Sequence, residues 1–499
     1  SPRLAFDPLW DMRQRIRADN DPLGIAGWLT TLVPPAYAAY RPLLADGLSF
    51  FLEHLSPIRQ QAILAAQLRL PASARPERRV LALLLLCPTL HKLGQVVAHD
   101  SRLSADLRRR LQQLESLLPG DSLARIRPLL DRELGHVAGL EIAQEAIAEA
   151  SVAVVVPFLW RQAGENGPQT GVLKVLRPGV RDRLDEELAI WPALGNHLEQ
   201  RCLVHHLPAL DYRHTLETVA RLLANEVRLE REQVHLQQAA AFYADSPDIL
   251  IPRLFPFSTA SVTAMERVDG CKVTTAEQPP QQMQRRGERI VRALLAGPFW
   301  QGDEAGAVFH ADPHAGNLLA TADGRLAIID WALTTRLSKR QCEAVVQLLL
   351  GALTLSDRRA CMAIAALGRP IDPGGLQLAV GSAIGQVRAG RFPGIEWMTS
   401  LLDDLATSSA VRFPEEMTLF RKALLTLSGV VADVSPRASI DRVLLREGAF
   451  RFFAGLAWRP WIWPDSRERV AAHLSNADLL GFCNELPLTA LRFWLGIRG

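Results

Sequence analysis

Residues 308–337 constrain this chain more than any other segment, because they place oxygen-bearing side chains around a predicted β-hairpin. Two apolar-rich runs, at 318–321 and 326–329, flank an Ala-Asp-Gly sequence that is a turn signal. A hairpin returns the chain to its starting end. Asn317 enters the first strand and Asp330 leaves the second, so these two side chains are predicted to lie side by side.

Asp312 precedes this hairpin, in a loop that contains proline and glycine. Carboxylate and amide oxygens are hard ligands that suit Mg²⁺ held jointly by a protein and by phosphates. The order Asp, Asn, Asp also matches a kinase catalytic centre, in which the first Asp orients the acceptor and the other two residues hold metal. Because Asp and Asn are common in loops for other reasons, the assignment depends on what precedes this segment.

A lysine-bearing strand lies upstream, in the order that a kinase site requires. Residues 172–176 are apolar except for Lys174, and Arg-Pro-Gly ends the run. Residues 152–157 predict a second strand, and the polar stretch 161–170 would join the two as a hairpin. A lysine inside such a strand is either a solvent-facing residue or a cation that contacts phosphate, and the strand alone does not decide between them.

A long helical region is predicted at 220–242, and it carries Glu226, Glu230 and Glu232. In kinases a helical glutamate orients the phosphate-binding lysine. Two more strands are predicted at 249–255 and 262–268. The succession of strand, lysine strand, glutamate helix, two strands and Asp/Asn loop is the order of a protein kinase.

Three signatures in this order make the chain resemble the UbiB/AarF/ADCK family of atypical kinases. Residues 91–95 read HKLGQ and match the family's KxGQ signature. Residues 173–179 read LKVLRPG and match its lysine strand, and residues 310–317 read HADPHAGN, followed by Ile-Asp at 329–330. The resemblance covers residues 90–337, about half of the chain.

The resemblance implies a protein-kinase-like fold that binds ATP and Mg²⁺ and phosphorylates proteins little or not at all. It also implies support for the biosynthesis of isoprenoid quinones and related lipids, usually in association with membranes. Lys174 would contact the nucleotide phosphates and Glu232 would pair with it, with Glu230 as the rival for that role. Met265 and Glu266 fall where the hinge contacts adenine.

The KxGQ segment would lie over the active site, where a protein substrate would otherwise dock. Lys92 and Gln95 are its signature residues, and Glu226 would be the partner of Lys92. The resemblance thus assigns catalytic and metal-binding roles to the following residues: Asp312, Lys174 and Lys92 as catalytic residues, and Asn317 and Asp330 as metal ligands.

The chain also departs from the family pattern. The alanine-rich nucleotide loop contains a charge here, so that the candidate cofactor-binding positions Ala148, Ala150 and Ser151 surround Glu149. A carboxylate there would repel phosphate unless it faced outward. In the ExD pattern, Arg228 replaces the second acid. In the Asp-Phe-Gly motif, Trp331 replaces the phenylalanine and Ala332 replaces the glycine. In the catalytic loop, Ala315 replaces a proline. We interpret the chain as a divergent member that still binds nucleotide.

The expected fold class is α+β and predominantly α: a bilobal protein-kinase-like fold with a small sheet-bearing N-lobe, a helical C-lobe and a helical N-terminal KxGQ extension. The boundaries follow changes in composition and pattern. Five segments are expected: a helical extension at 1–80, the KxGQ helices at 81–145, the N-lobe at 146–266, the C-lobe at 267–435 and an aromatic-rich helical tail at 436–499.

Composition limits the function classes. The chain has 499 residues, 48% of them hydrophobic and 22% charged, which is ordinary for a globular protein of two or three domains. The net charge of +3 is small and argues neither for nor against nucleic acid, and no nucleic-acid partner is expected. Six scattered cysteines without a CxxC pair predict buried free thiols in a reducing cytoplasm. His310 and His314 flank Pro313, which predicts structural or hydrogen-bonding roles rather than metal ligation.

No secretory signal is expected, and residues 23–40 lack charge but contain glycines and a Pro-Pro pair that disfavour a membrane-spanning helix. The tail mixes aromatic residues with arginines at 450–464. We expect it to pack on the large lobe, and insertion at a membrane interface is the alternative. The expected location is cytoplasmic, with peripheral contact on the inner face of the membrane left open.

The preferred function is an atypical kinase-fold ATPase or a kinase of a small molecule or lipid, with a biosynthetic enzyme as candidate partner. A pseudokinase scaffold is the alternative, favoured by the drifted Asp-Trp-Ala segment and opposed by the intact Lys174, Asp312, Asn317 and Asp330. An aminoglycoside-phosphotransferase-like enzyme shares the Asp/Asn/Asp layout, but the KxGQ signature argues against it.

Overall fold

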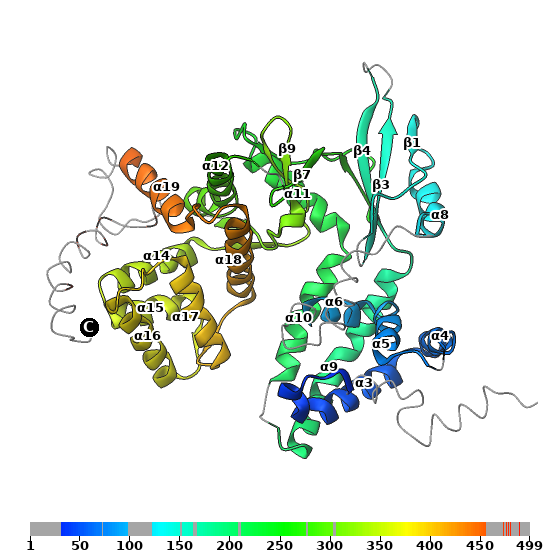
Figure 1. The fold of residues 1–499 in the computed structure, drawn as a ribbon, viewed down its shortest axis with the longest axis horizontal. Helices are drawn as coiled ribbons and strands as arrows, with labels where there is room; N and C mark the ends of the chain where they lie inside the picture. The colour runs from blue at the N-terminus through cyan, green and yellow to red at the C-terminus, as the bar shows by residue number, and fades with distance from the viewer. Residues whose placement is uncertain are drawn as a thin grey trace, which may run out of the picture. The chain divides into compact units, whose positions relative to one another are not determined.

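A computed structural model describes residues 31–71, 73–97, 122–149, 152–162, 167–207, 211–275, 278–302 and 306–455, with residues 473, 476, 478, 480 and 489. Helices predominate and small, mostly antiparallel sheets accompany them, which confirms the predicted α+β class (Figure 1). The chain divides into two compact units. Unit 1 comprises Ser1–Gln233 and Arg253–Arg267, and unit 2 comprises Val234–Pro252 and Val268–Gly499. The five-segment division stays a prediction.

The N-terminal helices of unit 1 are short, and most of them begin at a proline. A proline at the first helical position leaves no backbone donor unsatisfied and already has a helical φ. Pro88 likewise starts a new helix inside the apolar run 80–90. The helices are η1 (Pro35–Tyr40), α3 (Arg41–His54), α4 (Pro57–Leu68), α5 (Pro76–Leu84) and α6 (Pro88–Val97).

Three longer helices follow in this part of the chain: α9 (Val180–Val204), α10 (Tyr212–Glu226) and α11 (Leu229–Phe242). The helical region predicted at 220–242 is helical, but it consists of the end of α10 and the whole of α11. Val227 and Arg228 separate the two helices, and the amide of Arg228 donates to the carbonyl of Asn225 at 3.2 Å. Val227, at this break, is buried, so the helical spacing of apolar residues continues across it. A prediction from that spacing therefore does not detect the break.

A hydrophobic core joins these helices within unit 1. Its largest members come from α3, α4, α5 and α9, and α10 contributes Leu223. They include Phe51, Leu55, Ile63, Leu83 and Trp191.

Glu187 is a carboxylate buried inside this helical region, with none of its surface exposed. Its Oε1 accepts a hydrogen bond from Arg59 on α4, and its Oε2 accepts from the backbone amide and hydroxyl of Thr89 at 2.8 and 2.7 Å. Burial raises the pKa of Glu187, and the bonds from Arg59 and Thr89 act against that change. One side chain of α9 thus holds α4 and the first turn of α6.

The first sheet lies in unit 1 and has the order β1-β3-β4-β6, with β2 paired to β3. Its strands are β1 (Leu140–Ile142), β2 (Ala148–Glu149), β3 (Ala153–Trp160), β4 (Gln169–Leu176) and β6 (Val262–Glu266). Helix α8 (Ser122–Leu134) packs Ile126 and Leu130 against it (Figure 1). Gly171 lies opposite Phe158, and a Cβ there would be 2.2 Å from that ring, so only glycine fits.

The second sheet lies in unit 2 and has the order β5-β10-β9-β7. Its strands are β5 (Ile249–Leu250), β7 (Gly270–Lys272), β9 (Leu318–Thr321) and β10 (Leu326–Ile328). The strand predicted at 249–255 is much shorter than expected. Its first two residues run parallel to β10 in this sheet, whereas Leu254 forms an isolated antiparallel bridge with Met265 of β6 in the first sheet.

Two small antiparallel pairs complete the strands of unit 2: β8 (Ala307–His310) with β11 (Thr334–Leu337), and β12 (Arg369–Pro370) with β13 (Val411–Arg412). The helices are α12 (Pro280–Val291), the π-helix η3 (Arg292–Ala296), α13 (Gly297–Gln301), η4 (Ala315–Asn317), α14 (Lys339–Leu353), α15 (Asp357–Leu367), α16 (Pro373–Arg388), α17 (Ile395–Thr407), α18 (Glu415–Val434) and α19 (Ile440–Gly455).

Most of the aromatic tail lies outside the described residues, so its predicted packing stays a prediction. Phe450 and Phe453 are described in α19 and are exposed. No helix in the described part of the chain is both long and apolar enough to cross a bilayer. Cys87, Cys202 and Cys342 are buried free thiols, as predicted, whereas Cys271 is exposed.

The buried Glu187 leads to a prediction about stability. Glu187→Ala leaves the Arg59 cation without its buried partner, which costs about 3–5 kcal/mol. Asp185→Asn, at an exposed position of the same helix, changes stability by at most about 0.5 kcal/mol. Urea unfolding of both variants measures the difference. Equal stabilities for the two variants would show that Glu187 does not hold these helices together.

Candidate functional site

The hairpin of unit 2 has the geometry that the sequence predicted. Strands β9 and β10 pair antiparallel, with Leu318 opposite Ile328, and the amide of Ile329 donates to the carbonyl of Asn317 at 3.0 Å. Gly324 provides the positive φ of +84° that the turn requires. Asn317 and Asp330 therefore lie beside each other at the open end of the hairpin.

Asn317 is buried and ties the hairpin to the loop before it. Its Nδ2 donates to the carbonyl of Asp312 at 3.1 Å. The amide nitrogen is thereby engaged with the loop, and Oδ1 is the atom of this side chain suited to a cation.

His310 connects both acidic residues through their backbones. Its Nε2 bonds to the carbonyl of Asp330, and its Nδ1 bonds to the amide of Asp312 at 3.2 Å. A carbonyl only accepts and an amide N–H only donates, so Nε2 carries the proton and Nδ1 accepts. Burial lowers the pKa of His310, and the nearby carbonyl and carboxylates act against that change. A neutral imidazole with one fixed tautomer therefore holds the two loops.

The carboxylate of Asp312 lies near two side chains that carry or can carry positive charge. Lys422 on α18 places its Nζ 3.0 Å from Oδ1, and His314 places its Nε2 3.8 Å from Oδ2. Sequence reasoning missed Lys422. It lies far along the chain in an amphipathic helix, and nothing in its local sequence distinguishes it from a solvated surface lysine.

The Asp-Trp-Ala segment keeps Asp330 in a defined orientation in spite of its drift. The Oδ1 of Asp330 accepts from the amide of Ala332 at 2.8 Å. Trp331 is buried, and its indole donates to the carbonyl of Ile328 at 3.2 Å. The carbonyl of Trp331 bonds to the Nδ1 of His235 on α11 at 3.2 Å. The larger aromatic ring is accommodated as a core residue.

Unit 1 contains the predicted lysine pair. The Nζ of Lys174 lies 2.7 and 2.9 Å from the two carboxylate oxygens of Glu232, which is buried in the first turns of α11. Lys174 is only 13% exposed, so it is not a solvent-facing strand residue. Glu230 is exposed and lies 3.7 Å from Arg181 instead. Of the two rival glutamates, Glu232 is the one that contacts Lys174.

A second ion pair joins α6 to the end of α10. Lys92 lies 2.9 Å from Glu226, and both side chains remain about one-third exposed. Gln95 lies in α6, but its side chain is outside the described residues. The structure thus brings Lys92 and its expected partner together within unit 1.

The structure describes only some of the residues proposed to contact adenine and to form the nucleotide loop. Met265 is buried in β6, opposite Val172. The amide of Glu266 donates to the carbonyl of Arg253 at 2.8 Å. Ala148 pairs with Val155 in the sheet, whereas Ala150 and Ser151 lie outside the described residues.

The predicted site residues form two sets, and each set lies within one unit. Unit 1 holds Lys174 with Glu232 and Lys92 with Glu226, and unit 2 holds Asp312, Asn317 and Asp330. No cluster of three or more His, Cys, Asp or Glu side chains suited to a metal ion occurs among the described residues. Asparagine is not among these residue types, so this result does not test whether Asn317 and Asp330 together hold a metal ion.

Comparison with known proteins supports the same type of domain. A family model described as the ABC1 atypical kinase-like domain matches residues 123–365. An uncharacterized protein of Mycobacterium tuberculosis is 28% identical over 375 residues, which cover 70% of this chain and 73% of the relative.

Two further relatives have informative names. The chloroplastic Protein ACTIVITY OF BC1 COMPLEX KINASE 3 of Arabidopsis thaliana is 28% identical over 52% of this chain and 36% of its own length. The Probable protein kinase UbiB of Marinobacter nauticus is 27% identical over 54% of this chain and 49% of its own length. These matches agree with the kinase-like fold.

The role of His310 gives a prediction for this site. His310→Ala leaves the carbonyl of Asp330 and the amide of Asp312 without their imidazole partner, and a buried unsatisfied group costs about 1–3 kcal/mol. We expect a clear loss of stability in urea unfolding. His314→Ala, at a half-exposed ring in the same loop, serves as the control and loses much less. If the two variants lose the same stability, the imidazole of His310 is not what holds the loops.

Proposed function

Because the chain belongs to the UbiB/AarF/ADCK family of atypical kinases, we propose that it binds ATP with Mg²⁺ and acts as an ATPase or as a kinase of a small molecule or lipid. The observation that carries this proposal is the preserved set of functional groups in kinase order. Lys174 contacts a buried glutamate, and Asn317 lies beside Asp330 behind the loop of Asp312.

Lys174 would contact the phosphates of the nucleotide. The two bonds to Glu232 hold its ammonium group in place before any ligand arrives. Little conformational entropy remains to be lost on binding, and a cation with limited access to water interacts more strongly with phosphate. Glu232 would be a positioning residue that acts through Lys174.

Asn317 and Asp330 fit a magnesium ion by their chemistry. Both present hard oxygen atoms, and Mg²⁺ is typically held by one or two protein carboxylates together with phosphates and water. The amide nitrogen of Asn317 is bonded to Asp312, which leaves its oxygen as the ligand atom. The carboxylate of Asp330 is held by the bond from the amide of Ala332, and a carboxylate accepts about four hydrogen or metal bonds in all. Bound Mg²⁺ would neutralise phosphate charge.

Asp312 would orient an acceptor hydroxyl or a water molecule. Its contact with Lys422 holds the carboxylate in one direction and keeps a positive charge beside it. An acceptor that approaches Asp312 meets a lysine as well as a carboxylate. This arrangement favours a polar or anionic acceptor group over an apolar one.

The acceptor and the pathway belong to the proposal as well. Resemblance to the family favours support for the biosynthesis of an isoprenoid quinone, a lipid or a related metabolite. A biosynthetic enzyme as partner, a cytoplasmic location and peripheral membrane contact are proposed on the same basis. The names of the relatives describe those proteins, and none of them identifies the acceptor used here.

A pseudokinase scaffold is the second candidate function, because the carboxylate of Asp312 already contacts Lys422. In that case nucleotide binding would stabilise a platform for other enzymes without phosphoryl transfer. Nucleotide binding without any ATP hydrolysis, in the presence of candidate acceptors, would favour the scaffold.

The first test of the proposed function measures thermal unfolding with and without MgATP. A ligand that binds only the folded state stabilises it by about 2.7 kcal/mol at a hundredfold excess over its dissociation constant. We expect MgATP to raise the melting temperature, and Asp330→Asn to weaken the metal-dependent part of this shift while the fold is retained. Asp404→Asn, an exposed position on α17, is the control. The absence of any shift with nucleotide and metal would refute nucleotide binding.

The second test concerns Lys92, which is proposed to act near the nucleotide and to keep protein substrates out. The pair with Glu226 is partly exposed, so it contributes at most about 1 kcal/mol to stability. We expect Lys92→Ala and Glu226→Gln to change the ratio of ATP to ADP affinity, or the rate of ATP hydrolysis, more than the melting temperature. Lys339→Ala is the matched control. A loss of folding without a nucleotide effect would make Lys92 a structural residue, and efficient phosphorylation of generic proteins would contradict the excluded-substrate proposal.

A further inference from the structure

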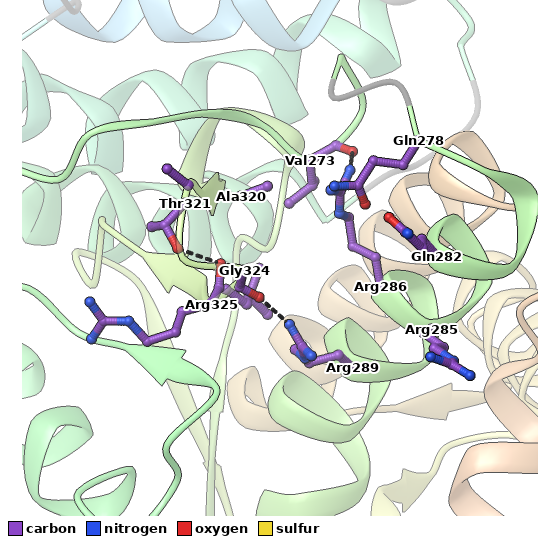
Figure 2. Close-up of a pocket in the computed structure, with 12 residues that line it drawn as sticks. Val273, Gln278, Gln282, Arg285, Arg286, Arg289, Ala320, Thr321, Gly324 and Arg325 are labelled. Carbon is purple, nitrogen blue, oxygen red and sulfur yellow. Dashed lines mark hydrogen bonds between the residues drawn. The ribbon is translucent and has the colours of Figure 1, made fainter.

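A cavity of about 310 Å³ lies in unit 2 between α12 and the turn of the β9–β10 hairpin (Figure 2). Polar side chains make up most of its lining: Gln278, Gln282, Arg285, Arg286, Arg289, Thr321 and Arg325. None of these residues belongs to the set proposed for nucleotide or metal.

Four arginines contribute to this lining, three from α12 and one from the hairpin. Figure 2 shows Arg289 reaching from α12 to Gly324 in the hairpin turn and Arg286 reaching to Val273. Arg285 and Arg325 extend outward on opposite sides of the cavity in the same view. Two guanidinium groups therefore face the space, and two more stand at its rim.

The inner arginines are held in place by the fold. The Nε of Arg289 lies 3.0 Å from a carboxylate oxygen of Asp248, and its Nη1 donates to the carbonyl of Gly324. Arg286 donates to the carbonyl of Val273 at 3.4 Å. A guanidinium group carries five N–H donors in a rigid planar fork, and these bonds fix the position of each fork.

The electrostatics of Arg286 agree with a site that favours negative charge. Burial lowers the pKa of its guanidinium, the thiol of Cys271 acts in the opposite direction, and the positive charge of Arg289 lowers it further. Two cations close together in a partly buried cavity repel each other, and an anion between them would offset that repulsion.

We propose that this cavity binds a phosphate-bearing anion. Guanidinium groups form paired, charge-assisted hydrogen bonds with phosphate oxygens, and the amides of Gln278 and Gln282 add further donors. The volume is at the lower end of the range for ligand pockets, roughly 300–1,000 Å³. A phosphate or diphosphate group fits that size better than a whole nucleotide does.

This site is distinct from the metal-binding end of the hairpin. The cavity contacts the turn from Thr321 to Arg325, whereas Asn317 and Asp330 lie at the open end. Strand β9 has four residues, which span roughly 13 Å at the usual rise of a strand. A ligand in the cavity would therefore bind in addition to a nucleotide.

The phosphate group could come from a soluble molecule or from a lipid headgroup, because both present the same chemistry. Calorimetry with sodium pyrophosphate tests the first source. The titration is done without divalent metal, in a full-length Lys174→Met, Asp330→Asn background, so that the proposed nucleotide site does not contribute. This background separates failure of the cavity proposal from failure of the proposed function.

We expect pyrophosphate to bind in that background, and Arg286→Gln to raise its dissociation constant about tenfold or more, which corresponds to ~1.4 kcal/mol. Arg285→Gln should have a smaller effect, since its side chain stands at the rim. Arg286→Lys should retain part of the affinity, which excludes a purely structural effect. Arg442→Gln, an exposed arginine on α19, is the control and should leave the affinity unchanged.

Flotation with phosphatidylcholine vesicles, with and without phosphatidic acid, tests the lipid source. Binding that requires phosphatidic acid, is blocked by pyrophosphate and is lost in Arg286→Gln would assign the site to a lipid headgroup. Pyrophosphate binding without vesicle binding would assign it to a soluble ligand. If neither probe binds, or if Arg286→Gln binds both as well as its parent does, the proposal is wrong.

Discussion

The hydrogen bonds of a neutral, buried histidine are the interaction on which the candidate catalytic segment of unit 2 depends. His310 donates to the backbone of Asp330 and accepts from the backbone of Asp312, while Asn317 bonds to the carbonyl of Asp312. These bonds connect the end of β8, the loop that holds Asp312 and the segment that follows β10. The loop segments that carry Asp312 and Asp330 are therefore positioned through their main chains.

In unit 1, by contrast, charged side chains are buried. Glu187 and Glu232 are both carboxylates with almost no exposure, and each faces a cation: Arg59 in the first case and Lys174 in the second. Buried pairs of this kind contribute little to stability relative to apolar residues of the same size. Each pair connects the two elements that carry it, because both charges are satisfied only when those elements pack together.

Local sequence signals predicted the parts of the site that are close together along the chain. The hairpin with Asn317 and Asp330, the lysine strand and the KxGQ helix follow from turn residues, alternation and motif spacing. The choice of Glu232 over Glu230 did not follow, because both lie on the same helix and only the direction of the strand carrying Lys174 separates them. The break at Val227 was missed because a buried apolar residue continues the helical pattern.

Long-range partners were beyond local signals for a simple physical reason. Lys422 and Asp312, or Arg59 and Glu187, meet only after whole helices have packed, and each residue taken alone resembles an ordinary surface charge. The parallel pairing of β5 with β10 also joins segments that are far apart in the sequence. A two-residue strand has too little pattern to indicate its sheet, and its partner is defined by the tertiary fold.

The half-exposed pair of Lys422 and Asp312 has a consequence for how this protein responds to its medium. Mobile ions screen exposed charges over about 8 Å at physiological ionic strength and over about 3 Å at 1 M salt. A direct contact at 3.0 Å survives such screening better than a distant attraction does, but water and counterions reach both partners. The immediate counterion of Asp312 is therefore a lysine in dilute buffer and increasingly a dissolved cation in concentrated salt. The dissolved electrolyte thus becomes part of the environment of the proposed catalytic acid.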